Sequence, residues 1–342
     1  MAIYFLILLI LLFFIHYKNE KRIFYFASVL LFLVFAFKNV NLGADTSSYF
    51  THFKELINGE NHYKTEPIWG LLAHLNLFFG GYYKSFQIIL FACTLPPVVY
   101  VIRKDSKNYV LSLFFYYAFF YYLNAFCIVR QAMALSYLLV CFHFIKTKKL
   151  VPATIFLIIA ILCHNLAILG IVAFIFYFKR FSLKTIVIVL GLAFIAGLFV
   201  NEHFLFLVPS RYQNLFLWEG HGFREKLMPY ILIIMAMNIV FIICLLRGSK
   251  TSLKSFWAQT VFAGLVIMNG SLNLVQGLRI SQFFMITQII FYANYTEEKE
   301  DKQNLYKWGL IAYSSIYFVG LLYRDSIGVV PYIPANWIQN LF

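Results

Sequence analysis

The sequence of 342 residues has little charge and, above all, few acidic residues. Charged side chains make up 12% of the chain, and 28 Lys and Arg stand against 14 Asp and Glu, for a net charge of +14. A soluble globular protein has about twice this charged fraction, because water must solvate its surface. The chain is also 62% hydrophobic, with a mean hydropathy of +0.78. We therefore expect a polytopic membrane protein.

Paired cysteines and the motifs of common soluble enzymes are missing as well. The five cysteines have no paired spacing and lie in or beside apolar runs, which argues against a disulfide framework or a metal knuckle. No HExxH, P-loop, GxSxG or GxGxxG motif occurs, so metalloproteases, nucleoside triphosphatases, lipases and dinucleotide enzymes receive no support. No basic stripe with stacking aromatics lies outside the apolar runs, so the positive charge does not indicate nucleic-acid binding.

Long apolar runs dominate what is present. In lipid every backbone polar group must be bonded within its own segment, so we predict that these runs are helices. Residues 67–79 are too short for a hydrocarbon core of about 30 Å and are predicted to form a short helix that does not cross. Residues 151–178 are predicted to form two short helices that turn near His164. The remaining predicted spans are 1–15, 23–37, 85–102, 109–124, 131–145, 185–200, 227–246, 255–274, 280–295 and 305–322.

The positive-inside rule orients these spans. If 67–79 does not cross and 151–178 crosses twice, 18 of the 28 basic residues lie in loops on one side, which is then cytoplasmic, and 10 lie on the other. We therefore predict an all-α polytopic membrane protein with about twelve transmembrane helices and both termini outside. Residues 1–342 are expected to form a single membrane domain, with the outer loops 38–84 and 201–226 forming the face that carries the site.

The kind of basic residue differs between the two sides. Arginine supplies 4 of the 18 inner basic residues but 5 of the 10 outer ones. Its guanidinium holds phosphate by two parallel hydrogen bonds, which lysine cannot match. An arginine at the edge of an apolar run is costly unless it faces a polar cavity or reaches the lipid headgroups. The candidates for anion binding are Arg130, Arg211 and Arg279, with the polar neighbours Gln131, Tyr212 and Gln282.

Three further polar residues are candidates for proton transfer or substrate binding. Asp45, in NLGADTSSYF, would either cap a helix that runs through Tyr49 or act as a base, bind hydroxyl groups or fix an arginine. Glu66 precedes Pro67, so it would either mark a helix start or supply a second carboxylate to a pocket. His164 lies in the middle of a long apolar segment. It would either bond to a neighbouring helix or serve as a general base.

The order of these features resembles the EpsG family of bacterial polysaccharide polymerases, which is related to the O-antigen (Wzy) polymerases. The resemblance covers most of the chain through six short motifs. One departure is Lys38, which stands where the family commonly has an arginine ahead of the GxDT stretch. The motifs are LGADTSSYF at 42–50, EPIWGLL at 66–72, IVRQAMALS at 128–136, LCHNLAIL at 162–169, SRYQN at 210–214 and GLRISQFF at 277–284.

The resemblance implies a glycosyltransferase of GT-C-like architecture at the outer face of the bacterial inner membrane. Such an enzyme transfers a growing glycan from undecaprenyl pyrophosphate to the non-reducing end of another lipid-linked repeat unit, with inversion at the anomeric carbon. We expect no cofactor and no metal. The expected partners are the undecaprenyl-pyrophosphate-linked donor and acceptor, the lipid bilayer, a chain-length regulator and a flippase, and no nucleic acid.

In this reaction the three candidate arginines would neutralise the leaving pyrophosphate. The acceptor hydroxyl would lose its proton to His164, or otherwise to Asp45. A lipid-linked oligosaccharide flippase or other transporter, another lipid-linked glycosyltransferase or ligase, and a membrane scaffold are the alternatives. A transporter is expected to have two related halves, and the sequence has no evident repeat. The predicted substrate-binding residues are Glu66, Gln131, Tyr212, Tyr49 and Gln282.

Overall fold

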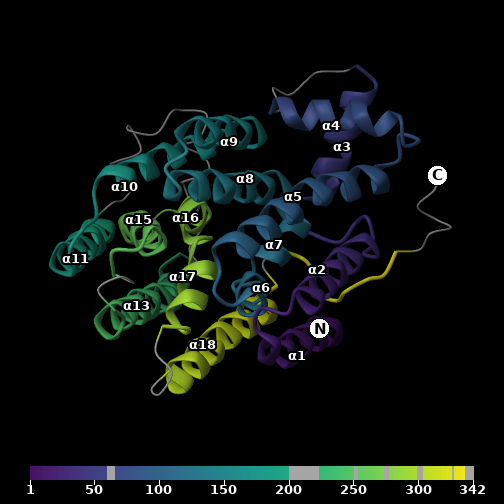
Figure 1. The fold of residues 1–342 in the computed structure, drawn as a ribbon. Helices are drawn as coiled ribbons and strands as arrows, with labels where there is room; N and C mark the ends of the chain where they lie inside the picture. The colour runs from purple at the N-terminus through teal and green to yellow at the C-terminus, as the bar shows by residue number, and fades with distance from the viewer. Residues whose placement is uncertain are drawn as a thin grey trace. The chain divides into compact units, whose positions relative to one another are not determined.

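The regular elements of the protein are helices, as predicted. The computed structural model describes residues 1–59, 66–199, 223–249, 253–272, 274, 277–298, 303–325 and 327–335. Within these ranges the only extended pairing is an isolated bridge between Lys38 and Pro334. The chain divides into two compact units (Figure 1), of which unit 1 comprises residues 1–168 and 292–342 and unit 2 comprises residues 169–291.

Unit 1 contains the helices of the first half of the chain together with the last helix, and unit 2 contains most of the helices that lie between them in the sequence. In unit 1 these are α1 (Ala2–Phe14), α2 (Lys21–Ala36), α3 (Thr46–Ile57), α4 (Pro67–Leu77), α5 (Tyr83–Asp105), α6 (Tyr109–Ala118), α7 (Tyr121–Cys127), α8 (Val129–Lys146), α9 (Leu150–Cys163) and α18 (Gln303–Arg324). Unit 2 holds α10 (Ile175–Phe178), α11 (Leu183–Phe199), α13 (Phe223–Arg247), α15 (Phe256–Gly270) and α16 (Gly277–Met285). The 3-10 helix η2 (Asn165–Phe174) and α17 (Gln288–Tyr295) cross the boundary.

Several helices have the length and apolar character of membrane spans. Among the described residues, α5 and the segments Tyr230–Arg247 and Leu305–Arg324 are each long and apolar enough to cross a membrane. Helices α6 and α7 meet the same test together, with a bend of 47° between them. The predicted span 109–124 is therefore broken, because Phe120 between the two helices adopts a left-handed conformation with φ 71°. The predicted span 280–295 is likewise divided into α16 and α17.

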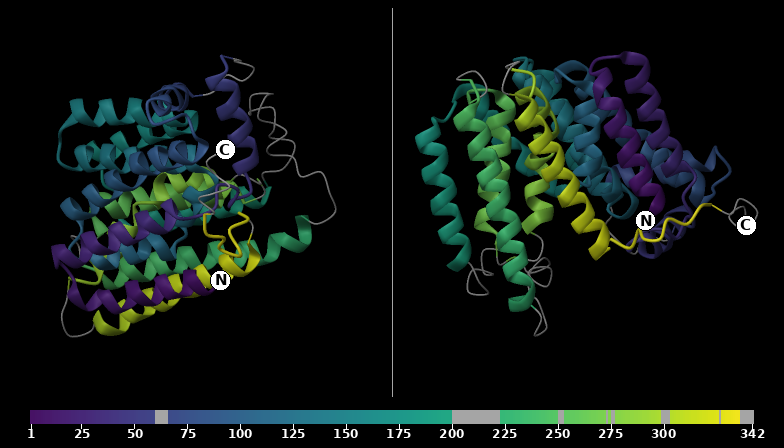
Figure 2. Two further views of the ribbon diagram at one scale, coloured as in Figure 1. Left: turned by 90° about the vertical axis from the view of Figure 1, so that its right-hand side faces the viewer. Right: turned by 90° about the horizontal axis from the view of Figure 1, so that it is seen from below.

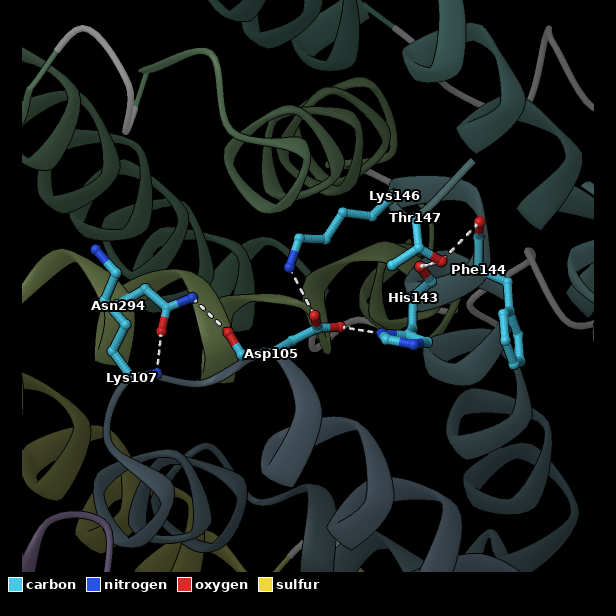
Figure 3. A network of polar contacts seen from close by, with 7 residues as sticks. All are labelled: Asp105, Lys107, His143, Phe144, Lys146, Thr147 and Asn294. Atoms are coloured by element: carbon cyan, nitrogen blue, oxygen red, sulfur yellow. Dashed lines mark hydrogen bonds and ion pairs between the residues drawn. The ribbon is translucent and has the colours of Figure 1, made fainter. Parts of the chain in front are cut away.

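One end of unit 1 gathers basic loops that the sequence predicts to share a side. Lys146 at the end of α8 forms an ion pair of 2.6 Å with Asp105 at the end of α5, as Figure 3 shows. Lys18, in the loop between α1 and α2, forms an ion pair of 3.0 Å with Glu297. Asn108 also donates to Glu297, at 3.0 Å. The loops that follow α1, α5 and α8 therefore meet at one end, which we call the basic end.

At the opposite end of unit 1, which we call the site end, the C-terminal end of α2 meets the start of α5. The Lys84 amine, near the start of α5, donates a hydrogen bond to the carbonyl of Lys38, just after α2. The 23 residues of α5 extend about 34 Å, so this contact lies far from Asp105. Because the chain leaves α2 and enters α5 at the same end, residues 39–82 make no net crossing. Helix α4, with 11 residues, agrees with the predicted short, non-spanning helix.

The segment after α18 also lies at the site end. Its backbone pairs with the loop after α2, with Asn39 N–H donating to Ile333 O at 2.7 Å and Ala44 N–H donating to Ile327 O at 2.8 Å. The Tyr4 hydroxyl, in the first turn of α1, donates to Val329 O at 2.6 Å. The start of α1 and the described end of the chain therefore share one end of unit 1.

Unit 2 contains a bundle in which α11, α13 and α15 pack against one another (Figure 2). Gly197 of α11 permits one close approach, because a Cβ atom there would lie 1.8 Å from the carbonyl oxygen of Asn269 in α15. The Asn269 side chain bonds to that of Asn238 in α13 at 2.8 Å. The three helices are thus joined by a small polar contact within an apolar bundle.

Candidate functional site

The loop that carries Asp45 makes a close contact which only glycine permits. Gly43 has φ +123°, and a Cβ atom there would lie 2.6 Å from the carbonyl oxygen of Phe126. Asp45 follows and precedes α3, the helix that the sequence predicts through Tyr49. Its side chain makes no capping hydrogen bond, although it stands at the capping position. The half-buried Asp45 carboxylate is therefore not used as a helix cap.

Glu66 precedes α4, and Pro67 occupies the first turn, which its fixed φ favours. Trp69 follows one turn later and is buried, with its ring 5.1 Å from that of Tyr49 and 4.9 Å from that of Phe86. This packing fixes α4 against α3 and α5. Glu66 makes no capping bond either. Its carboxylate instead forms an ion pair with Arg130.

Arg130, in the first turn of α8, is the centre of the site. Its Nη1 lies 2.6 Å from Glu66 Oε2, and its guanidinium lies over the rings of Tyr49, at 5.2 Å, and Trp69, at 5.6 Å. Arg130 also donates a hydrogen bond to the Tyr49 hydroxyl. Arg130 remains 25% exposed and Glu66 11%. A guanidinium has five N–H donors, so these partners orient Arg130 while leaving it donors for an anion.

Tyr49 contributes a neutral hydroxyl to this arrangement. Burial raises its pKa to about 12, although the neighbouring Arg130 acts in the opposite direction. Asp45 lies within electrostatic range of the same hydroxyl and also raises the pKa of Tyr49. At neutral pH the Tyr49 hydroxyl therefore keeps its proton and can both donate and accept hydrogen bonds.

Two lysines, Lys38 and Lys84, hold the loop before Asp45. The Lys38 amine is buried and lies 3.3 Å from Leu42 O, and Lys84 bonds to Lys38 O. From the next turn of α5, Gln87 Nε2 donates to Val40 O at 3.0 Å. Burial, followed by repulsion from Lys84, lowers the pKa of Lys38 to about 7. These side chains satisfy the carbonyls that follow α2 and so position the Asp45 loop.

His164 lies where the sequence predicts a break, between the end of α9 and the start of η2. The adjacent Cys163 is within electrostatic range of Glu66, and α4 packs against α9, so this end of α9 lies close to Glu66. The backbone N–H of Leu166 donates to His164 Nδ1 at 3.3 Å. A neutral ring that accepts at Nδ1 carries its proton on Nε2, and this nitrogen is then a donor.

The structure brings together some of the predicted site residues. Arg130, Glu66 and Tyr49 are in contact, and Asp45 lies one turn from Tyr49. Gln131 is buried in α8. Arg279, which is exposed, and Gln282, which is half-buried, belong to α16 of unit 2. Arg211 and Tyr212 lie outside the described residues.

Sequence reasoning did not single out Trp69, Lys84 or Gln87. Trp69 had a detectable signal, since it follows Glu66 by three positions and so lies on the same face of the predicted helix. In the sequence Lys84 stands only as the last residue of the predicted outer loop 38–84. Gln87 lies inside that span, where one polar residue in an apolar run gives little indication of its partner.

Apolar helices of membrane-spanning length, with a half-buried arginine–carboxylate pair at one end of the bundle, define an integral membrane protein with a polar site at that end. Sequence comparison makes this more specific: the chain belongs to the EpsG family, whose sequence model matches residues 21–333. The matched region includes Lys38, Asp45, Glu66 and Arg130, and membership indicates a polymerase-like function in polysaccharide biosynthesis. No curated protein and no solved structure matches the chain.

Proposed function

We propose that this protein polymerises undecaprenyl-pyrophosphate-linked oligosaccharide repeat units of an O antigen, capsule or exopolysaccharide at the outer face of the bacterial inner membrane. The observation that carries the proposal is the Arg130–Glu66 pair, which lies within a frame of aromatic rings at the end of unit 1 opposite the basic loops. A fixed guanidinium suits a leaving group that gains negative charge, because it stabilises that charge without reorganising.

The proposed reaction is a single displacement at the anomeric carbon of the donor glycan. The acceptor hydroxyl oxygen attacks from the face opposite the pyrophosphate, and a new glycosidic bond forms with inversion. The bond between the anomeric carbon and the phosphate oxygen breaks, and undecaprenyl pyrophosphate leaves with the electron pair. Arg130 binds the leaving pyrophosphate, and Arg211 and Arg279 are proposed to share this role. Glu66 holds Arg130 in place and keeps it charged.

The proton of the acceptor hydroxyl goes to the Asp45 carboxylate. The sequence ranks His164 ahead of Asp45 for this role, but Leu166 already donates to His164 Nδ1. We therefore propose that His164 donates through Nε2 to an oxygen of the substrate, while Asp45, which makes no capping bond, accepts the proton. The remaining predicted contacts to sugar hydroxyls are those of Tyr49, Gln131, Tyr212 and Gln282.

The test is substitution of Arg130 in a strain that lacks the chromosomal gene. Arg130→Lys keeps the charge but loses the planar fork, so we expect at least a tenfold loss of long chains. Glu66→Gln should also reduce long chains, because it removes the charge that orients Arg130. The matched control is Arg324→Lys, which replaces an exposed arginine in the last turn of α18 and should keep the normal ladder of chain lengths. Normal ladders from Arg130→Lys and Arg130→Ala would refute the proposal.

The same strains separate a polymerase from a flippase. A polymerase variant still delivers single repeat units to the outer surface, whereas loss of a flippase leaves the units on the cytoplasmic side. Labelling intact cells with a membrane-impermeant glycan reagent should therefore detect single units in the Arg130→Ala strain. Absence of outer-surface units in that strain would favour the flippase alternative.

A further inference from the structure

A small cavity lies beside the Arg130–Glu66 pair. It has a volume of about 10 Å³, and Lys38, Trp69 and Gln87 are among the residues that line it. Tyr49 and Trp69, which lie under the Arg130 guanidinium, also form part of its wall. A cavity of this size accepts about one water-sized group. It has no room for a phosphate or an acetamido group.

The cavity wall includes two buried polar side chains that each have one atom without a hydrogen-bond partner among the described residues. Trp69 is 1% exposed, and its Nε1–H, a donor, has no partner among the described residues. Gln87 is 7% exposed, and its Oε1, an acceptor, has none either, although its Nε2 is bonded to Val40. Buried polar groups are nearly always hydrogen-bonded, so such a pair in one cavity requires an explanation.

A hydroxyl group satisfies both atoms, because it accepts one hydrogen bond and donates another. We propose that Trp69 and Gln87 form a subsite that binds one hydroxyl group of a sugar in the lipid-linked repeat unit. The Trp69 indole donates to the hydroxyl oxygen, and the hydroxyl donates to Gln87 Oε1. This inference rests on the proposed function, and it makes the two residues determinants of which sugar is accepted, since an analogue without that hydroxyl leaves both atoms unpaired.

Water has the same hydrogen-bonding chemistry as a sugar hydroxyl, so the experiment must separate the two. The probe is the single lipid-linked repeat unit, isolated from a strain that lacks this gene, and the protein is the full chain in lipid nanodiscs. With tryptophan labelled with ¹⁵N, the indole signal of Trp69 is assigned by its absence in Trp69→Phe. We expect this signal to shift when the repeat unit is added and to stay in place with undecaprenyl pyrophosphate alone.

Kinetics give a second readout. Trp69→Phe keeps an aromatic ring under Arg130 but removes the donor, so KM for the repeat unit should rise about five- to tenfold while kcat changes less than twofold. The control is Trp257→Phe, a buried tryptophan of α15 that does not line the cavity, and its KM should match that of the unmodified protein. With Gln87→Met added to Trp69→Phe, KM should rise by less than the product of the single effects, because both residues bind one hydroxyl.

A Trp69 indole signal that does not move with the repeat unit, together with an unchanged KM, would mean that only water occupies the cavity, and the inference would be overturned. That result is distinct from failure of the proposed function, which would appear as normal polymerisation by Arg130→Lys. The indole signal reports binding and does not require turnover.

Discussion

The charge of Arg130, at one end of the helix bundle, is stabilised by a few side chains that contact its guanidinium. Its partner Glu66 is 64 positions earlier in the sequence, and the rings of Tyr49 and Trp69 face its guanidinium. Ion pairing offsets the cost of removing the charge from water, and the negative faces of aromatic rings add to this. The sequence identified both Arg130 and Glu66 as candidates. It did not pair them, because the pairing depends on how α3 and α4 fold back on the bundle.

Gly43 is predicted to be essential for the Asp45 loop. Gly43→Ala would place a Cβ atom 2.6 Å from the Phe126 carbonyl and impose φ +123° on an alanine, which L-residues rarely adopt. The loop must then move, so we expect at least a tenfold loss of long polymer at normal protein levels in the membrane. The control is Gly320→Ala in α18, where a Cβ atom meets no atom within 4 Å. Equal chain-length ladders from the two variants would contradict this account.

Lys38 is predicted to make stability depend on pH. Burial, then Lys84, lowers its pKa from the usual 10.5 to about 7, so between these values the unfolded state binds more protons than the folded state. The free energy of unfolding should therefore rise as the pH is raised from 7 towards 10, and the destabilising effect should be largest below pH 7.

The measurement for Lys38 is the thermal unfolding temperature of the detergent-solubilised protein at several pH values between 6 and about 9.5, the range set by the lowered pKa. Lys38→Met lacks the titrating amine and should show a smaller rise than the unmodified protein. Parallel curves for the two proteins would show that Lys38 does not carry the effect. The comparison cancels the contribution of other lysines, cysteines and tyrosines that titrate in the same range.

Helices α5 and α8 pack as a parallel pair, and polar contacts join them at the basic end. At the site end, side chains from the first turns of α5 bind the loop after α2. At the basic end, Asp105 Oδ2 lies 2.6 Å from His143 Nδ1, and Asp105 Oδ1 lies 2.6 Å from Lys146 Nζ (Figure 3). Because both helices run in the same direction, α6 and α7 between them make the return crossing as one bent span.

Asp105 is predicted to stabilise this helix pair without affecting the chemistry. Asp105→Asn keeps the size of the side chain but removes the charged acceptor that His143 and Lys146 share, which should cost about 2–3 kcal/mol. We expect a lower unfolding temperature and less protein in the membrane, with a normal distribution of chain lengths per molecule at permissive temperature. Glu20→Gln, at an exposed position before α2, should change stability by less than about 0.5 kcal/mol. An unfolding temperature for Asp105→Asn equal to that of Glu20→Gln would refute the prediction.

The positions of the helices could be predicted from the sequence better than their continuity. Apolar runs place α2, α5 and α8 within a few residues, because each run must satisfy its backbone inside lipid. The break at Phe120 could not be predicted, since neither proline nor glycine marks it and a left-handed phenylalanine is imposed by packing. The short helix at 67–77 and the break at His164 were predicted because length and a polar residue mark them.

At the scale of the molecule, loops that the sequence predicts to share one side lie together at one end of unit 1, and the candidate site lies at the other end. The loops after α1, α5 and α8 meet at the basic end, and the Arg130–Glu66 pair lies at the other, as the positive-inside rule predicts. The composition of the site could be predicted only in part. Arg130 was identified as a charge at the edge of an apolar run, Glu66 as the residue before Pro67 at a predicted helix start, and Tyr49 as part of the helix predicted to follow Asp45. The contribution of Gln87 depends on tertiary contacts that no spacing in the sequence reveals, whereas the spacing of three positions between Glu66 and Trp69 is visible in the sequence.

This arrangement predicts opposite accessibility for the two ends in the membrane. Ser47 in α3 is exposed at the site end, and Lys149 is exposed just after α8 at the basic end. We expect Ser47→Cys to react with a membrane-impermeant maleimide added to spheroplasts, and Lys149→Cys to react only after the membrane is permeabilised. Both variants are made in a protein that also carries Cys93→Ala, because Cys93 is half-buried and could react, whereas the other four cysteines are buried. Labelling of Lys149→Cys alone in intact spheroplasts would place Arg130 and Glu66 on the cytoplasmic side, where the proposed lipid-linked acceptor would already have been flipped away from them.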